Sequence, residues 1–157
     1  MKNAIILHGG PSEKEYYDPK APSMSNAHWI PWLQGQLLKV DIAAATPEIP
    51  HSFDRNWQTW NREVERFDIG PETILIGHST GAGFFIKYLS IHKKLKVNKV
   101  ILVAPWLDPD HNRTKDFFDD FKIDSDLVSR TKGVTIFCSD NDQESVSKNR
   151  RYASSAN

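Results

Sequence analysis

The sequence TILIGHSTGAG at residues 73–83 is the most informative part of this chain. Residues 73–76 are apolar and mostly β-branched, which is typical of a buried strand. Residues 77–81, GHSTG, match the pattern G-x-S-x-G, in which a serine occupies a sharp turn between a strand and a helix. Glycine is needed on both sides because a side chain two positions from the serine would collide with neighbouring backbone. An ordinary strand–loop–helix junction is the alternative, but the apolar flanks favour Ser79 as a nucleophile.

Length and charge limit the class of protein. The chain has 157 residues, with 20 basic and 20 acidic side chains, so its formal net charge is zero. This length suits one domain with one core, and we expect residues 1–157 to form a single α/β domain. Zero net charge argues against nucleic acid or an anionic membrane as a partner. The apolar run near the amino terminus is too short for a secretory signal, so we expect a cytoplasmic location. Nothing in the sequence predicts the oligomeric state.

Strand-like and helix-like segments alternate along the chain. Apolar runs at residues 4–7, 42–46, 99–104 and 133–138 are typical of strands, in addition to residues 73–76. Between them, apolar residues recur at helical spacing, and one such helix carries Trp29 and Trp32. We expect the tryptophans to pack in the core, with a rim position beside the active site as the alternative for Trp29. Residues 12–26 are polar, and we expect a surface loop there. The alternation predicts a three-layer αβα sandwich around a mostly parallel sheet.

Loops that follow parallel strands gather at one edge of the sheet, where ligands bind. Four such loops carry polar or aromatic groups, so we expect them to form one crevice. We expect the backbone N–H groups of Gly10 and Thr80 to form an oxyanion hole beside Ser79. We expect the substrate pocket to be lined by three further side chains: His8, Trp29 and Trp106.

A serine hydroxyl needs a general base, usually histidine, and a carboxylate that orients that base. Asp142 is the candidate acid and Asp140 the second choice, and by spacing alone an ordinary turn residue is an equally good interpretation of either aspartate. None of the six histidines follows Asp142. His8 is one stand-in, whereas His78 should point away from its neighbour on the turn. We expect the chain to be cut short, with a sixth strand, a last helix and the histidine after residue 157.

Residues 108–130 are rich in aspartate and phenylalanine. We expect a short cap-like excursion that closes over the site with its phenylalanines inward. Its first residues, DPDHN at 108–112, are similar to a calcium-binding loop. However, Arg113 stands where such a loop needs glycine, and Asp119 stands where it usually has glutamate. We therefore expect no metal site and no cofactor.

Taken together, these motifs resemble the α/β-hydrolase superfamily and, more narrowly, the small serine hydrolases of the retinoblastoma-binding protein nine and YdeN type. The likeness rests on the first strand running into HGG, on ILIGHSTGAG, on KVILVAPW and on TIFCSDND, and it spans nearly the whole chain. It implies a five-stranded sheet in the order 2-1-3-4-5, with the sixth strand and last helix missing. It also implies Ser79 as the nucleophile, Asp142 as the acid, and Gly10 and Thr80 as oxyanion-hole donors.

The function that follows is hydrolysis of small esters, thioesters or amides through an acyl-enzyme on Ser79, with a small acyl compound as the partner. The alternative is a catalytically inactive binding or interaction protein of the same fold, because no histidine follows the acid. A nucleotide-binding domain is disfavoured, since the glycines match neither G-x-G-x-x-G nor G-x-x-x-x-G-K-[ST].

Overall fold

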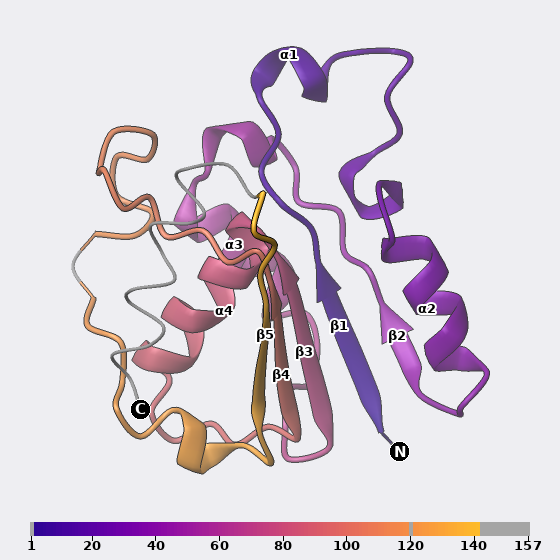
Figure 1. Cartoon of the computed structure of the whole chain (residues 1–157), viewed down its shortest axis with the longest axis vertical. Coiled ribbons are helices and arrows are strands. Elements are labelled where there is room, and N and C mark those ends of the chain that lie inside the picture. The colour runs from indigo at the N-terminus through magenta and orange to yellow at the C-terminus, as the bar shows by residue number, and fades with distance from the viewer. Residues whose placement is uncertain (1, 120, 142–157) are drawn as a thin grey trace.

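The computed structural model describes residues 2–119 and 121–141, and within them a five-stranded sheet forms the centre (Figure 1). All neighbouring strands pair in parallel, in the order β2-β1-β3-β4-β5. The predicted α/β class and the predicted strand order are therefore confirmed. The strands are β1 (Asn3–Leu7), β2 (Ala43–Ala45), β3 (Thr73–His78), β4 (Lys99–Val103) and β5 (Val134–Phe137).

Helices cover both faces of the sheet. On one face lies α2 (Ile30–Leu38), and on the other lie α3 (Trp57–Val64) and α4 (Thr80–Ile91) (Figure 1). Side chains of β1 alternate between two apolar clusters, as a strand requires. Ile5 and Leu7 pack with α3 and α4, whereas Ala4 and Ile6 pack with α2. The central strands β1 and β3 are therefore buried on both sides, which explains why they are continuous apolar runs, whereas the edge strands β2 and β5 are partly exposed.

Two local expectations are wrong. Residues 12–26 are not simply a loop, because they contain α1 (Glu13–Tyr16) and the 3₁₀ turn η1 (Met24–Asn26). Ser12 and Glu15 form a capping box in which the Ser12 hydroxyl accepts from the Glu15 N–H and the Glu15 carboxylate accepts from the Ser12 N–H. Its spacing, S-x-x-E, is visible in the sequence. On α2, Trp32 is 65% exposed and does not join the core, because it lies on the helix face turned from the sheet.

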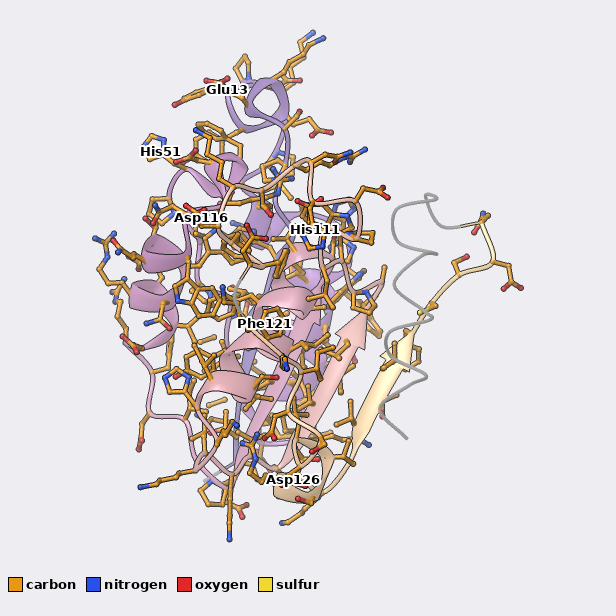
Figure 2. The ribbon with its side chains drawn as sticks, turned by 90° about the vertical axis from the view of Figure 1, so that its left-hand side faces the viewer. Glu13, His51, His111, Asp116, Phe121 and Asp126 are labelled. Carbon is orange, nitrogen blue, oxygen red and sulfur yellow. The ribbon has the colours of Figure 1, made fainter. Side chains whose placement is uncertain are left out.

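A long segment joins β4 to β5 and crosses the face that α4 covers, running past His111, Phe121 and Asp126 (Figure 2). Phe117 and Phe118 are buried in the main apolar cluster. Lys87 of α4 is itself buried, and its ammonium group donates to the carbonyls of Phe117 (2.8 Å) and Asp119 (3.1 Å). The segment, which also contains the 3₁₀ turn η3 (Val128–Arg130), is thus fixed to α4 by apolar packing and by one buried cation.

In the described part of the chain, every helix is too short or too polar to cross a membrane.

Candidate functional site

Ser79 stands at the junction of β3 and α4 in a strained backbone conformation, with φ 52° and ψ −115°. Residues other than glycine rarely adopt a positive φ, and such strain is often found at functional sites. Three hydrogen bonds hold the turn. The Ser79 N–H donates to the Val103 carbonyl (2.9 Å), and the Ser79 carbonyl accepts from the N–H groups of Gly83 (3.1 Å) and Trp106 (3.2 Å). The strained residue is therefore supported by β4, by α4 and by the loop after β4.

The two glycines of the motif are required by close backbone contacts. A Cβ atom on Gly77 would lie 2.5 Å from Cα of Ala82, in the first turn of α4. A Cβ atom on Gly81 would lie 2.6 Å from the carbonyl oxygen of Leu7, at the end of β1. Both distances are below any normal contact for a Cβ atom. The sequence pattern thus reflects how tightly α4 packs against β3 and β1.

A cavity of about 910 Å³ lies over the carboxyl ends of the strands and is lined by Ser79. Three other residues predicted for the site line the same cavity: Gly10, Thr80 and Trp106. A Cβ atom on Gly10 would lie 3.2 Å from the Thr80 hydroxyl oxygen, so the two candidate oxyanion-hole residues adjoin each other. Thr80 is the first residue of α4, where a backbone N–H has no acceptor within the helix and the helix dipole favours negative charge.

His8 does not line this cavity, because its ring is buried beneath the loop. Its Nε2 accepts a hydrogen bond from the Ile49 N–H (3.0 Å), so Nε2 carries no proton. Nδ1 must then carry the proton, which it donates to the Gly9 carbonyl (2.7 Å). Burial lowers the pKa of His8, although the bond to Gly9 and the charge of Glu48 oppose that shift. The ring is therefore a neutral structural group whose acceptor nitrogen is occupied, and it is badly suited to take a proton from Ser79.

Trp29 also lies behind the cavity wall. It is half-buried in the α2 cluster and packs edge-on against His78, with ring centroids 5.7 Å apart. His78 does line the cavity, as does His28, whose ring centroid is 5.4 Å from that of His78. Sequence patterns gave no reason to select His28, because its loop reaches the site only through the packing of α2 on the sheet.

Of the two candidate acids, Asp142 lies outside the described residues. Asp140 follows β5 as an exposed residue and is not among the side chains that line the cavity. Both remain predictions from the motif after the fifth strand.

Two arginines that the sequence did not single out line the cavity, Arg55 from the loop before α3 and Arg113 from the segment after β4. The guanidinium of Arg55 donates to the carbonyls of Gly10 (3.0 Å) and Phe53 (2.9 Å). It also lies over the Trp106 ring, 5.3 Å from the centroid. Neither arginine belongs to a recognisable motif, so only the fold brings them to Ser79.

The calcium-like start of the segment after β4 has a structural role in its own loop. The buried Asp108 carboxylate accepts hydrogen bonds from the N–H groups of Asn112, Arg113 and Thr114 and from the Thr114 hydroxyl. Burial alone raises the pKa of Asp108, but these hydrogen bonds outweigh burial and hold the pKa below its usual value. Within the described residues, no group of three or more metal-ligating side chains gathers in one place.

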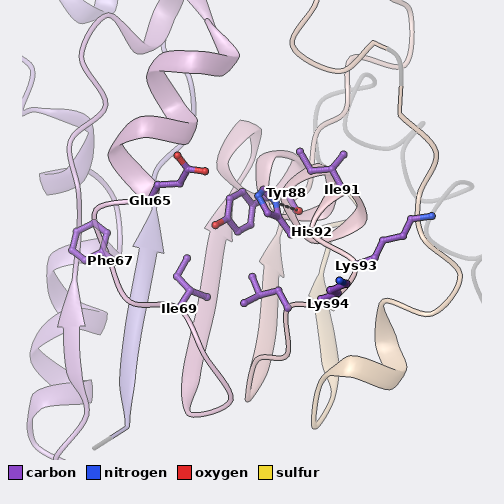
Figure 3. A pocket seen from close by; sticks show the side chains of 9 residues that line it. Glu65, Phe67, Ile69, Tyr88, Ile91, His92, Lys93 and Lys94 are labelled. Atoms are coloured by element: carbon purple, nitrogen blue, oxygen red, sulfur yellow. Dashed lines mark hydrogen bonds between the residues drawn. The ribbon is translucent and has the colours of Figure 1, made fainter.

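A second cavity, of about 690 Å³, lies at the opposite end of α4 (Figure 3). Its walls are mainly apolar and include Phe67, Ile69 and Tyr88, with Lys93 and Lys94 at the side. It lies at the far end of the helix that begins next to Ser79, so the chemistry of the motif belongs to the first cavity.

Comparisons with known proteins agree with this architecture. A family model described as serine hydrolase matches residues 22–156. Among solved structures, the ydeN gene product from B. subtilis has a TM-score of 0.77 at 20% identity, covering 99% of this chain and 81% of that one. A pyrethroid hydrolase from Sphingobium faniae JZ-2 has a TM-score of 0.45 at 16% identity, covering 68% and 40%. No curated protein matches the chain by sequence. The first structural likeness shows a shared fold.

Proposed function

The chain belongs to the serine hydrolase family, and we propose that it hydrolyses small esters, thioesters or amides through an acyl-enzyme on Ser79. One observation carries the proposal. Ser79 has a positive φ on the strand–helix turn and lines a cavity together with Thr80 and Gly10. A serine held in this way beside the amino end of a helix suits attack on a carbonyl carbon.

In the proposed reaction, the Ser79 Oγ forms a bond to the substrate carbonyl carbon while its proton passes to a base. The carbonyl oxygen becomes an oxyanion, which the N–H groups of Thr80 and Gly10 stabilise. The bond to the leaving group then breaks, and the leaving group takes the proton. Water attacks the acyl-enzyme in the same way and releases the acid and the free Ser79 hydroxyl.

Asp142 is the proposed partner that orients the base. For the base itself, His8 is disfavoured because the Ile49 N–H already occupies its acceptor nitrogen. Among the described residues, His28 and His78 are the histidines that line the cavity. Replacing each by alanine and measuring the rate of covalent labelling against pH tests whether either one activates Ser79.

The direct test is labelling with an active-site-directed fluorophosphonate. The wild-type protein should be labelled at Ser79, and the Ser79→Ala variant should not. Equal labelling of both proteins would contradict the mechanism.

A non-catalytic binding protein of the same fold is the second candidate. The observation that favours it is the occupied acceptor nitrogen of His8, which removes the nearest stand-in base suggested by the sequence. This candidate predicts ester turnover no higher than that of Ser79→Ala. Turnover well above that background would exclude it.

A further inference from the structure

We propose that the cavity beside Ser79 selects acyl substrates that carry a carboxylate, which Arg55 and Arg113 bind. The inference rests on the proposed function, because it places the reacting carbonyl at Ser79. It adds a substrate class to the site, a half-ester or a similar derivative of a small dicarboxylic acid.

The guanidinium of Arg55 is held in place beside the oxyanion loop. Its Nη1 donates to the Phe53 carbonyl and its Nη2 to the Gly10 carbonyl, while the group lies over the Trp106 ring. Each of these nitrogens has a second N–H group. Among the described residues, neither of these second N–H groups has a hydrogen-bond acceptor. Because the head group is already ordered, a ligand would lose little side-chain entropy on binding to it.

The positive charge of the two arginines is not balanced by a paired carboxylate. Among the described residues, no ion pair includes Arg55 or Arg113. Burial holds the pKa of Arg55 below its usual value, the charge of Arg113 adds to this effect, and Asp108 opposes it. The two like charges therefore influence each other, and an anion placed between them would relieve their repulsion.

Two acidic side chains close to the arginines, Asp108 and Glu15, form their hydrogen bonds with the backbone of nearby turns. The Asp108 carboxylate accepts its hydrogen bonds from residues 112–114 of its own loop. Glu15, which lines the cavity, accepts from the N–H (2.8 Å) and the hydroxyl (2.7 Å) of Ser12. Both acids stabilise backbone turns and neither forms an ion pair with Arg55 or Arg113, so the guanidinium N–H donors stay available to an external anion while the charge of Asp108 still acts on Arg55.

The hydrogen bonds to Asp108 also fix the backbone position of Arg113. Asp108 fixes the backbone of residues 112–114, while the Arg113 side chain remains exposed at the cavity. One arginine is thus ordered at the oxyanion loop, and the other is presented from a fixed turn. A planar carboxylate matches the donor geometry of guanidinium groups.

The test compares esters of equal length that differ in charge. Wild-type protein should hydrolyse the p-nitrophenyl half-ester of glutaric acid with a higher kcat/KM than neutral p-nitrophenyl valerate. Arg113→Gln should lower kcat/KM for the half-ester about 10- to 100-fold, as expected for loss of a charge-assisted hydrogen bond, and lower kcat/KM for the valerate ester much less. Lys115→Gln, which removes an exposed cation two residues away that does not line the cavity, is the matched control and should behave as wild type.

Calorimetry with glutarate on the Ser79→Ala variant separates the inference from the proposed function. Binding that Arg113→Gln weakens, without turnover of either ester, would support the anion site and contradict the hydrolase. Ser79-dependent hydrolysis of valerate without a preference for the half-ester, and with no effect of Arg113→Gln, would overturn the anion site alone. Equal weakening by Lys115→Gln would also overturn it, because the effect would then be general screening. Absence of both turnover and glutarate binding would overturn both proposals.

Arg55→Lys gives a second measurement, since Arg55 also supports the Gly10 loop. The lysine keeps the charge but loses the two-pronged geometry. We expect a larger loss of kcat/KM for the half-ester than for valerate. An equal loss for both esters would show that Arg55 only positions the loop, and would contradict its part in anion binding.

Discussion

Gly77 at the end of β3 packs directly against Ala82 in α4, with no room for a Cβ atom: such an atom would lie 2.5 Å from Cα of Ala82. The contact is between backbones, so no side-chain rotation can relieve it. We expect Gly77→Ala to push α4 away from the sheet and to lower the free energy of unfolding by about 1–3 kcal/mol. Urea unfolding followed by circular dichroism measures this loss.

Gly35 provides the control for that substitution. It lies within α2, and a Cβ atom added there would meet nothing within 4 Å. Alanine is a better helix former than glycine, so Gly35→Ala should raise the free energy of unfolding by about 0.5–1 kcal/mol. Similar losses in the two variants would contradict the assignment of the Gly77 effect to a backbone collision.

The strained backbone of Ser79 can be tested independently of catalysis. Glycine adopts φ 52° without the steric cost that a Cβ atom causes, whereas alanine keeps that cost. We therefore expect Ser79→Gly to be about 1 kcal/mol more stable than Ser79→Ala, although glycine loses more backbone entropy on folding. Both variants lack the hydroxyl, so their difference in thermal unfolding reports the strain. Equal stability would show that the turn stores none.

His8 should make stability depend on pH. Its ordinary pKa is 6.5, and burial lowers the pKa in the folded state. As the pH falls below 6.5, His8 in the unfolded chain binds a proton before His8 in the folded protein does. The stability that neutral His8 contributes is therefore complete above pH 6.5 and is lost as the pH falls through the lowered pKa of the folded state. The free energy of unfolding of wild type, measured between about pH 5 and 8, should fall toward acid.

The variant His8→Gln isolates this contribution, because all other titratable groups are the same in the two proteins. Its stability should be lower at neutral pH and should change less on acidification than that of wild type. Parallel pH profiles for the two proteins would contradict a buried neutral histidine at position 8.

Lys87 should hold the segment between β4 and β5 in place against α4. Replacing it with methionine removes the donor to the Phe117 and Asp119 carbonyls and keeps most of the side-chain volume. We expect a loss of about 1–3 kcal/mol from these unsatisfied carbonyls, with earlier proteolytic cleavage in residues 108–121. Lys96→Met, at an exposed position, should cleave as wild type does. Cleavage that starts elsewhere in Lys87→Met would argue against this role.

Much of the fold could be predicted because its signals are local. A buried parallel strand must be a short apolar run, and residues 73–76 and 100–103 satisfy that rule without reference to the rest of the chain. The strand order came from the resemblance rather than from any local rule. The exposure of Trp32 was not predicted from spacing, because an apolar residue next to the apolar stripe of α2 fits the helical pattern, whereas the structure packs Ile30, Leu33 and Leu37 on the sheet and leaves Trp32 exposed.

For the site, the turn that carries Ser79 could be read from the pattern of glycines at positions 77 and 81, because the backbones of Ala82 and Leu7 leave no room there for a Cβ atom. Which other side chains reach Ser79 could not be read in this way. The tertiary structure places His8 beneath the loop and brings Arg55 and Arg113 to the cavity from segments far apart in sequence. The physical reason is the kind of contact. Close packing of backbone on backbone admits only glycine and so leaves a pattern in the sequence, whereas side-chain contacts between distant loops require no particular residue type and depend on how the helices pack on the sheet.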